Sequence, residues 1–497
     1  MKYLAFFLLF AWSSFIFPPE KQPNILFLIA DDWSYPHASI YGDPVVQTPT
    51  FDFLASEGAV FQNAYCASPS CSPSRAAILT GRYPHQNESV GNLWSVFPGH
   101  LPNYVRTLGQ NGYFTGKARK GWGPGDHEAG GYEHNPAGEH FDSFKAFLKA
   151  RPKNQPFCYW FGSQDPHRKY TTNTGTLVGM NRDAVKVPGF FPDTECVRND
   201  ILDYYFEVER FDRECGHIIR QLEENGELDN TIIVMTSDNG MPFPRAKANL
   251  YDYGTRMPLA VYWKGEVKAG TTIEAFVNSI DLAPSFLEAA GIEVPKNMSG
   301  QPIWSLLRGE KEDTDRSKIF LERERHANAR KGDLSYPMRA VRTHNYLYIR
   351  NFEPNRYPAG DPEVHQSVGQ YGDVDNSITK FEILDREGKK GAVDYFQLAF
   401  GKRPAEELYN VKTDPFQLTN LAGEESLQDT LAHYQQLLND FMIETNDLRA
   451  TQPNTIYWDT VRYTPTYQRR NFDLQKGIDD YFMLSTSSGR RDTTWCE

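Results

Sequence analysis

The sequence is poor in several features that would assign it to other classes of protein. It has only six cysteines among 497 residues, too few for a disulfide-stapled scaffold. Positive charge is not in excess, since 52 lysines and arginines face 64 aspartates and glutamates, for a net charge of −12. That balance excludes a global basic field of the kind that attracts nucleic acid. An anionic substrate would need a local basic pocket.

Long apolar runs are also missing, except at the N-terminus. The run from Leu4 to Phe17 follows a single Lys2 and is too short to span a bilayer comfortably. It predicts a secretory signal over about residues 1–20, with no defined cleavage site. No cysteine lies in or just after the run, which argues against a lipid anchor. We therefore expect an exported protein, periplasmic or secreted, with no stable membrane insertion.

Two continuous apolar runs indicate a parallel sheet. Ile25–Ile29 and Ile232–Met235 do not alternate with polar residues, which is typical of strands buried on both faces. A long helical pattern over 201–225 precedes the second run, and strand and helix patterns alternate to a strand near residue 320. This order predicts an α/β domain over about residues 21–330.

The pattern changes after about residue 336. Residues 338–351 alternate with period two, which predicts antiparallel pairing with one face exposed to solvent. A short strand in "EELYNV" and an amphipathic helix over about 426–446 follow. We expect a smaller α+β domain over 331–497 that contributes to the substrate pocket.

Each of the two buried runs ends in an acidic or amide pair. Asp31-Asp32 follows the first and Asp238-Asn239 follows the second. Ligands of open α/β sheets bind at the carboxyl ends of the strands. Three carboxylates and an amide meeting there would suit Ca²⁺ or Mg²⁺. One pair alone would more simply cap a helix or a turn.

The stretch "CSPSRAAILTGR" begins at Cys71 and predicts a helix with Pro73 in its first turn and Gly81 at its end. The N–H groups and dipole of such a helix start favour negative charge beside Cys71. Arg75 would point to the same end. The alternative is an ordinary capped helix with a half-buried cysteine.

This stretch resembles the signature C-x-P-S-R-x-x-x-L-T-G-R of the formylglycine-dependent (type I) sulfatases, and every fixed position matches. The resemblance implies that a maturation enzyme oxidises Cys71 to formylglycine (3-oxoalanine), whose hydrate is the nucleophile. It also implies a Ca²⁺ site, with Mg²⁺ as the other option, made of residue 71 and the two acidic pairs. The implied fold is the alkaline-phosphatase-like α/β sandwich with a small C-terminal domain.

Further basic residues match the family in part. The family lysine in "GY-x6-KWHLG" falls on Lys120, with Lys117 as the rival, and Trp122 stands where the family has histidine. His167 in "QDPHRKY" and Lys247, after the second acidic pair, take the places of two further active-site residues. Each alone would fit a solvated loop or a structural position.

The resemblance implies a mechanism. Arg75, Lys120, His167, Lys247 and the cation would form an electropositive pocket for a sulfate ester. The cation lowers the pKa of a hydroxyl of the hydrated formylglycine, and that oxygen attacks sulfur in line with the leaving group. His167 or Lys247 protonates the sugar oxygen, and the second hydroxyl then expels sulfate.

Several segments resemble the heparan N-sulfatase (sulfamidase) branch in particular, among them "LTGRYPHQN" and "LSYPMRAVR". Two departures, Trp122 and Lys247 in place of that branch's histidine and arginine, favour an O-linked sulfate on another glycan. We expect a sulfatase that releases sulfate from a polysaccharide or oligosaccharide. Candidate substrate contacts are His85, Gln86, Trp122, Arg323, His326, Arg339 and Arg356.

Three alternatives remain open. The first is a sulfamidase acting on heparan-type glycans. The second is a phosphodiesterase or phosphonate hydrolase of the same superfamily, although a two-metal phosphatase would need a further Asp/His set that the sequence does not offer. The third is a non-catalytic glycan-binding relative, in which Cys71 would remain unmodified.

Overall fold

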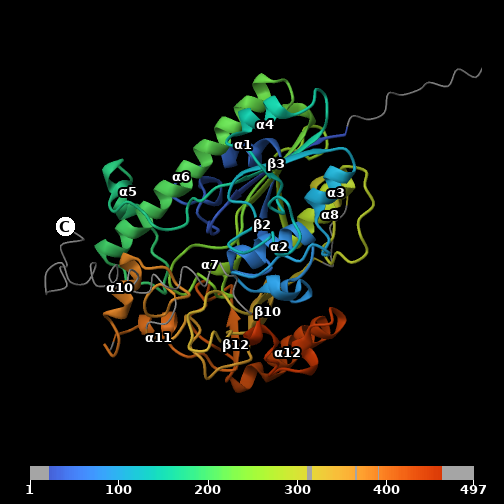
Figure 1. Ribbon diagram of the computed structural model, residues 1–497. Helices are drawn as coiled ribbons and strands as arrows, with labels where there is room; N and C mark the ends of the chain where they lie inside the picture. Colours follow the sequence, from blue (N-terminus) through green and yellow to red (C-terminus); the bar gives the residue numbers. More distant parts are fainter. Residues whose placement is uncertain (1–21, 311–315, 364–366, 390, 462–497) are drawn as a thin grey trace, which may run out of the picture.

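The computed structural model describes residues 22–310, 316–363, 367–389 and 391–461 (Figure 1). The predicted signal over 1–20 lies outside the described residues, as does the end of the predicted C-terminal domain after residue 461. No helix within the described ranges is long and apolar enough to cross a membrane.

The larger sheet has eight strands in the order β4-β3-β5-β1-β6-β7-β2-β8. All its pairings are parallel except those of β7, which runs antiparallel to β6 and β2. The strands are β1 (Asn24–Ala30), β2 (Ala59–Tyr65), β3 (Phe114–Arg119), β4 (Glu139–His140), β5 (Phe157–Gly162), β6 (Thr231–Ser237), β7 (Leu259–Tyr262) and β8 (Thr271–Asn278). The two predicted apolar strands, β1 and β6, are neighbours at its centre.

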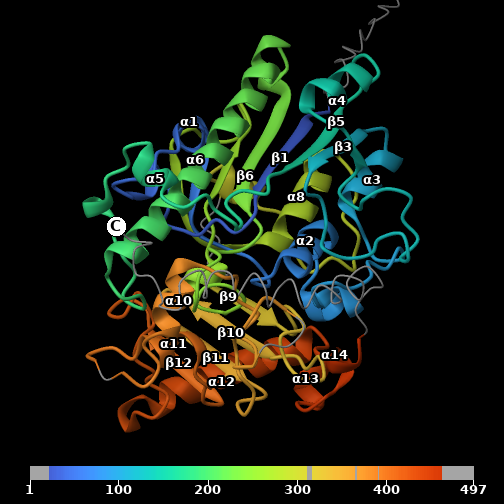
Figure 2. The same ribbon diagram turned by 60° about the vertical axis from the view of Figure 1, so that its left-hand side comes forward.

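Helices cover both faces of this sheet (Figure 2). Leu26 and Leu28 of β1 pack in one core with α1, α4 and α6, whereas Ile25 and Phe27 pack in another with α2, α3 and α8. Burial on both sides is the physical reason why β1 is apolar without alternation. The helices of this part are α1 (Pro49–Glu57), α2 (Cys71–Thr80), α3 (Tyr104–Gln110), α4 (Phe144–Ala150), α5 (Thr174–Leu177), α6 (Glu195–Glu224), α7 (Asp252–Thr255), α8 (Leu282–Ala289) and α9 (Trp304–Leu307).

The smaller sheet is antiparallel, in the order β12-β11-β10-β9. Its strands are β9 (Lys318–Arg323), β10 (Met338–Thr343), β11 (Tyr346–Asn351) and β12 (Glu406–Asn410), and the helices around it are α10 (Ile378–Leu384), α11 (Tyr395–Phe400), α12 (Gln428–Glu444), α13 (Leu448–Thr451) and α14 (Tyr457–Thr460). Both the mixed, mostly parallel first sheet and the antiparallel second sheet agree with the predicted fold class. The placement of the strand near residue 320 was wrong, because β9 pairs with β10 rather than with the first sheet.

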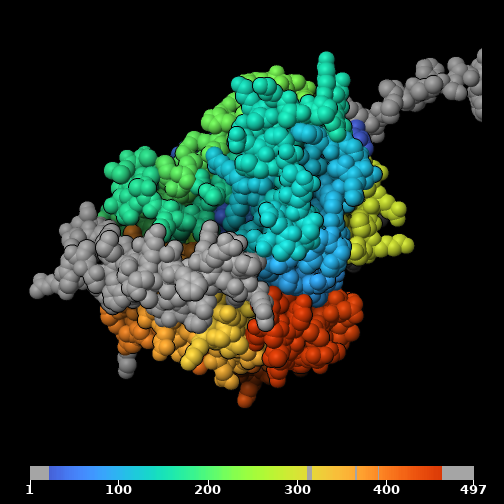
Figure 3. Space-filling view, viewed as in Figure 1, coloured from blue at the N-terminus to red at the C-terminus, as the bar shows by residue number. Residues whose placement is uncertain are grey.

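The prediction that one face of the smaller sheet is exposed to solvent is also wrong. Met338 and Ala340 of β10 face a core shared with the first domain, while Val341 packs under α12 on the other side. Arg339, which the alternation would place in water, is 0 % exposed. Its charge is buried because carboxylates surround it. Figure 3 shows the orange and red C-terminal part lying directly against the first domain.

Candidate active site

Cys71 occupies the first position of α2, at the carboxyl-end edge of the larger sheet. The helix ends at Gly81, which takes a left-handed φ of 64° and caps it, as the sequence predicts. Cys71 is 3 % exposed, and its thiol donates to Oδ1 of Asp31 at 3.4 Å. Burial, together with the charge of Asp31, raises the pKa of the Cys71 thiol well above its usual range. The unmodified thiol is therefore protonated at neutral pH and is a weak nucleophile.

The two acidic pairs meet beside Cys71 because β1 and β6 are adjacent and parallel. Ligand atoms of Asp31, Asp32 and Asp238 all lie within 4.8 Å of one another. Asp32 has a left-handed φ of 77°, a strained conformation for a residue with a side chain, and such strain concentrates at functional sites. The local backbone thus turns consecutive carboxylates toward one point.

The donor set fits a hard divalent cation. Oδ1 of Asn239 is buried and accepts no hydrogen bond, while its amide nitrogen donates to Asp32 at 2.5 Å. A buried carbonyl oxygen without a partner is costly, and a cation would supply that partner. Three carboxylates and this amide oxygen are the ligand type that Ca²⁺ and Mg²⁺ take.

Two predicted lysines lie in the site. Nζ of Lys120 lies 2.6 Å from Asp31, and Nζ of Lys247 lies 2.5 and 2.6 Å from the two oxygens of Asp32. Burial raises the pKa of Asp31, but the charges of Lys120 and its neighbours outweigh this and lower it to about 2. The rival Lys117 instead donates to the carbonyl of Arg119. The count of six residues after the Gly-Tyr pair therefore selects the lysine that reaches the site.

Arg75 is wholly buried and lies behind the acidic pairs. Its Nε donates to Asp238 at 2.7 Å, and its remaining donors bind the carbonyls of Ala30, Lys120 and Gly121. With every donor group engaged inside the protein, Arg75 orients Asp238.

The charges of the site balance without a metal ion. Asp31, Asp32 and Asp238 carry three negative charges, and Arg75, Lys120 and Lys247 carry three positive ones. A divalent cation would leave this group with a net charge of +2. The metal would thus create the local positive field that the net charge of the chain does not provide.

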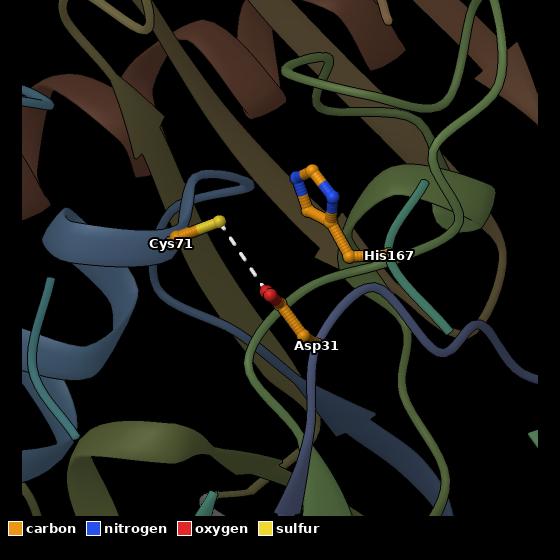
Figure 4. Close-up of side chains that lie close together, drawn as sticks. All are labelled: Asp31, Cys71 and His167. Atoms are coloured by element: carbon orange, nitrogen blue, oxygen red, sulfur yellow. Dashed lines mark hydrogen bonds between the residues drawn. The ribbon is translucent and has the colours of Figure 1, made fainter. Parts of the chain in front are cut away.

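His167 completes the site from the loop after β5. Figure 4 shows Asp31, Cys71 and His167 converging from three separate elements, and their ligand atoms lie within 4.8 Å of one another. Nδ1 of His167 lies 2.6 Å from the carbonyl of Arg168, so its Nε2 faces the site, 3.8 Å from Asp32. Burial lowers the pKa of His167, but the surrounding carboxylates raise it more.

Asp375 is a site residue that the sequence did not predict. Its Oδ2 lies 4.0 Å from Nε2 of His167. It comes from a loop of the C-terminal part, more than two hundred residues from His167 in the chain, with no motif around it. Only the packing of the two parts brings it there.

Three predicted substrate contacts lie inside the protein instead. The ring of Trp122 is 3 % exposed, packs against Phe97, and donates to the carbonyl of Ser72, which leaves no free face for a sugar. Arg339 is bound by carboxylates, as described above. His85 has a 2 % exposed side chain and lies 2.9 Å from Glu322. Tertiary contacts thus engage the polar groups of all three side chains, and none of them presents a free group to a sugar.

Three others are also engaged internally. Gln86 accepts from the N–H of Tyr83 and from Ser299, Arg323 is 1 % exposed and paired with Asp373, and Arg356 pairs with Asp459. His326 lies beside the site. Its Nδ1 is 2.8 Å from Oγ of Ser70, next to Cys71. Burial, with Lys247 and Arg323 nearby, lowers the pKa of His326 to about 3, so it is neutral.

Comparison with known families identifies the family of the chain. The profile of the Sulfatase family matches residues 23–146 and 138–292, more than half of the chain. The chain belongs to the sulfatase family. A second profile, described as the N-sulphoglucosamine sulphohydrolase C-terminal region, matches residues 245–358. The protein is thus a sulfatase-family hydrolase.

Several sulfatases are similar along most of their length. An ulvan-active sulfatase of Formosa agariphila is 28 % identical over 86 % of this chain and 76 % of its own. The N-sulphoglucosamine sulphohydrolase of Homo sapiens is also 28 % identical, over 88 % of this chain and 93 % of its own. An N-acetylglucosamine-6-O-sulfatase of Bacteroides thetaiotaomicron is 25 % identical over 88 % and 89 %.

Solved structures share the fold at lower identity. A protein bound to its substrate D-glucosamine-2-N,6-O-disulfate superposes with a TM-score of 0.63 at 21 % identity, over 86 % of this chain and 99 % of that one. A phosphonate monoester hydrolase of Silicibacter pomeroyi reaches 0.64 at 17 % identity, over 86 % and 96 %. The fold therefore does not by itself distinguish sulfate from phosphonate esters.

Proposed function

We propose that this sulfatase hydrolyses sulfate esters of a carbohydrate, with a formylglycine made from Cys71 and a divalent cation, Ca²⁺ by preference. The observation that carries the proposal is the set of groups around Cys71. A helix N-terminus, two lysines, a histidine and a cluster of cation-binding oxygens converge on one buried side chain whose thiol is held protonated.

Each group of the chain has a distinct task. The cation, held by Asp31, Asp32, Asp238 and Asn239, would supply charge neutralisation at the sulfate and at residue 71. Lys120 and Lys247 lie within 2.6 Å of the metal-binding carboxylates, where they would hold the sulfate oxygens by charge.

His167 is the candidate proton donor to the leaving sugar oxygen. Its Nδ1 is occupied by the Arg168 carbonyl, which fixes the ring and leaves Nε2 directed into the site. The nearby carboxylates favour its protonated form, which a general acid requires. Hydrolysis would consume one water and release sulfate and the sugar alcohol.

The sugar class is inferred from relatives. Ulvan-active, glucosamine-directed and carrageenan-binding proteins occur among the similar chains and folds. The C-terminal profile and the human relative support an N-sulfated glucosamine as the second candidate. We favour an O-linked sulfate, because Lys247 and Trp122 stand where the resemblance to the sulfamidase branch calls for arginine and histidine.

We also propose export by the N-terminal segment and oxidation of Cys71 by a maturation enzyme. The mass of the peptide that carries residue 71 separates cysteine from formylglycine. A cysteine mass in the active enzyme would contradict the central claim. This measurement comes first because the expression host must supply the modification.

The function is tested by sulfate release from a panel of sugars. The panel holds N-sulfoglucosamine, glucosamine 6-sulfate, ulvan oligosaccharides and carrageenan oligosaccharides, with phenylphosphonate as the competing class. We expect turnover of a sulfated sugar above that of the phosphonate. C71S, made in a host that modifies only cysteine, should abolish it, whereas C158A, at a buried cysteine of the sheet core, should retain it. Full activity of C71S would overturn the proposal.

A further inference from the structure

A buried lysine organises the loop that carries Asp375. Nζ of Lys380 in α10 donates to the carbonyls of Val374 at 2.7 Å and Tyr371 at 3.3 Å, and to Oδ1 of Asn376 at 3.2 Å. Lys380 is 0 % exposed, and burial lowers its pKa to about 7. Because its three donors bind residues of this one loop, Lys380 holds the shape of the loop.

The first carboxylate of the loop is fully used inside the protein. Asp373 accepts from the backbone N–H of Ala327 at 2.9 Å and from Arg330 at 2.6 Å, and it also pairs with Arg323. These contacts tie the loop to β9 and to the segment that follows it. Asp373 therefore has a structural role.

The second carboxylate of the loop, Asp375, differs because one of its oxygens lacks a hydrogen-bond partner. Oδ2 of Asp375 is buried and has no hydrogen-bond partner, although its side chain as a whole is 27 % exposed. Burial raises the pKa of Asp375, but His167 and Lys247 outweigh this and lower it to about 2. An ionised acceptor thus stands beside the reacting centre, within reach of a ligand.

Such an acceptor discriminates between the parts of a sulfated sugar. The sulfate group carries only acceptor oxygens and negative charge, so it cannot donate to Asp375 and is repelled by it. Ring hydroxyl and N–H groups are donors, and a site that pairs a buried acceptor with them rejects analogues that lack them.

We propose that Asp375 binds the substrate by accepting a hydrogen bond from a hydroxyl or N–H group on the sugar ring that carries the sulfate. This inference rests on the proposed function and adds a specificity-determining residue to it. Lys380 and the Asp373 pairs are then positioning groups, which keep the acceptor beside His167.

The test compares D375N with D142N in the metal-loaded, modified enzyme. Asp142 has a 98 % exposed side chain, so D142N makes the same charge change away from the site. For the panel sugar that the wild type hydrolyses, we expect D375N to raise KM at least tenfold. The inhibition constant of inorganic sulfate should not rise, because D375N removes a charge that repels the anion, and D142N should change neither quantity. An unchanged KM, or equal changes in KM and in the sulfate constant, would overturn the inference.

The substrate offers a second measurement that needs no variant. Deoxy analogues of that sugar each lack one ring donor. For one of them, kcat/KM of the wild type should be at least tenfold lower than for the parent sugar, whereas kcat/KM of D375N should be the same for both sugars. If no analogue couples to D375N in this way, Asp375 does not bind a ring donor.

Two further outcomes separate the possible failures. If D375N loses the bound metal by elemental analysis, Asp375 is a metal ligand with Asp32 and His167 and the inference is wrong. If the wild type hydrolyses no sugar of the panel, the proposed function itself fails and the inference fails with it. If the wild type hydrolyses the sugar and D375N has the same KM, only the inference about Asp375 fails and the proposed function stands.

Discussion

Two buried clusters of charged side chains differ in how completely the protein satisfies them. One lies between the two parts of the chain, and we call it the interface cluster. Every side-chain polar atom in it has a hydrogen-bond partner. Its members are His85, Glu322, Glu324, Arg339, Asp447 and Arg449.

The other cluster, around Cys71, has polar atoms left over. Oδ1 of Asn239 and Oδ2 of Asp375 are buried and accept nothing. Both clusters contain several carboxylates and cations, so charge alone does not distinguish them. We propose that the complete cluster holds the fold together and that the incomplete one is where the metal ion and the substrate would bind.

Removal of the metal from the cluster around Cys71 should have the largest effect on activity and stability. A chelator should lower kcat on the order of 10³- to 10⁴-fold, because charge stabilisation by a cation is worth several kcal/mol. It should also lower the Tm, since a bound ion stabilises by about 3–4 kcal/mol at 100 to 1,000 times its Kd. Calcium should restore both. An unchanged Tm in the chelated enzyme would show that Asn239 and its neighbours hold no ion.

Breaking the interface cluster should destabilise without changing the chemistry. R339M leaves Glu322, Glu324 and Asp447 short of their buried cation, which we expect to cost about 3–5 kcal/mol of unfolding free energy in a denaturant titration. The matched control R213M removes a surface pair with Glu209 and should cost less than about 1 kcal/mol. Well below the Tm, kcat/KM of R339M should stay within threefold of the wild type.

The interface cluster should also respond to pH through His85. Burial lowers the pKa of His85, but Glu322 and Asp447 raise it more, against the opposing charge of Arg339. A raised pKa in the folded state means that the stabilisation is full below the unfolded value near 6.5 and is lost as pH rises through the folded pKa. H85Q should lack this loss, so its unfolding free energy should fall less than that of the wild type as the pH rises.

The exposed pair of His100 and Glu88 serves as the control for that measurement. H100Q should change the unfolding free energy by less than about 1 kcal/mol, because the pair is exposed to solvent. A wild-type profile that matches H85Q at every pH would mean that folding does not shift the pKa of His85.

The smallest effect is expected at Trp122. W122F removes the hydrogen bond to the Ser72 carbonyl and should cost about 1 kcal/mol of stability. KM for the sugar should not change, because the ring is buried against Phe97. A tenfold rise in KM with unchanged stability would return Trp122 to the substrate site.

Much of the site is encoded locally and was predictable from sequence. The apolar runs of β1 and β6, the acidic pairs that end them, and the capped helix from Cys71 to Gly81 each follow from a few adjacent residues. Adjacent parallel strands then bring the pairs together. The choice of Lys120 over Lys117 came instead from the resemblance to the sulfatase pattern.

Which partners the long polar side chains bind was decided by tertiary structure. In the sequence, Arg339, His85 and Arg356 cannot be told apart from residues that bind substrate. Only the tertiary structure shows that each is paired with a carboxylate from a distant part of the chain. Asp375 carries no motif, and only the loop held by Lys380 brings it to His167. The sequence determined the helix that carries Cys71, the proposed nucleophile, and also the oxygen cluster and the central strands, because these depend on neighbours in the chain. Tertiary structure decided which buried charges are satisfied, because their partners lie tens to hundreds of residues away.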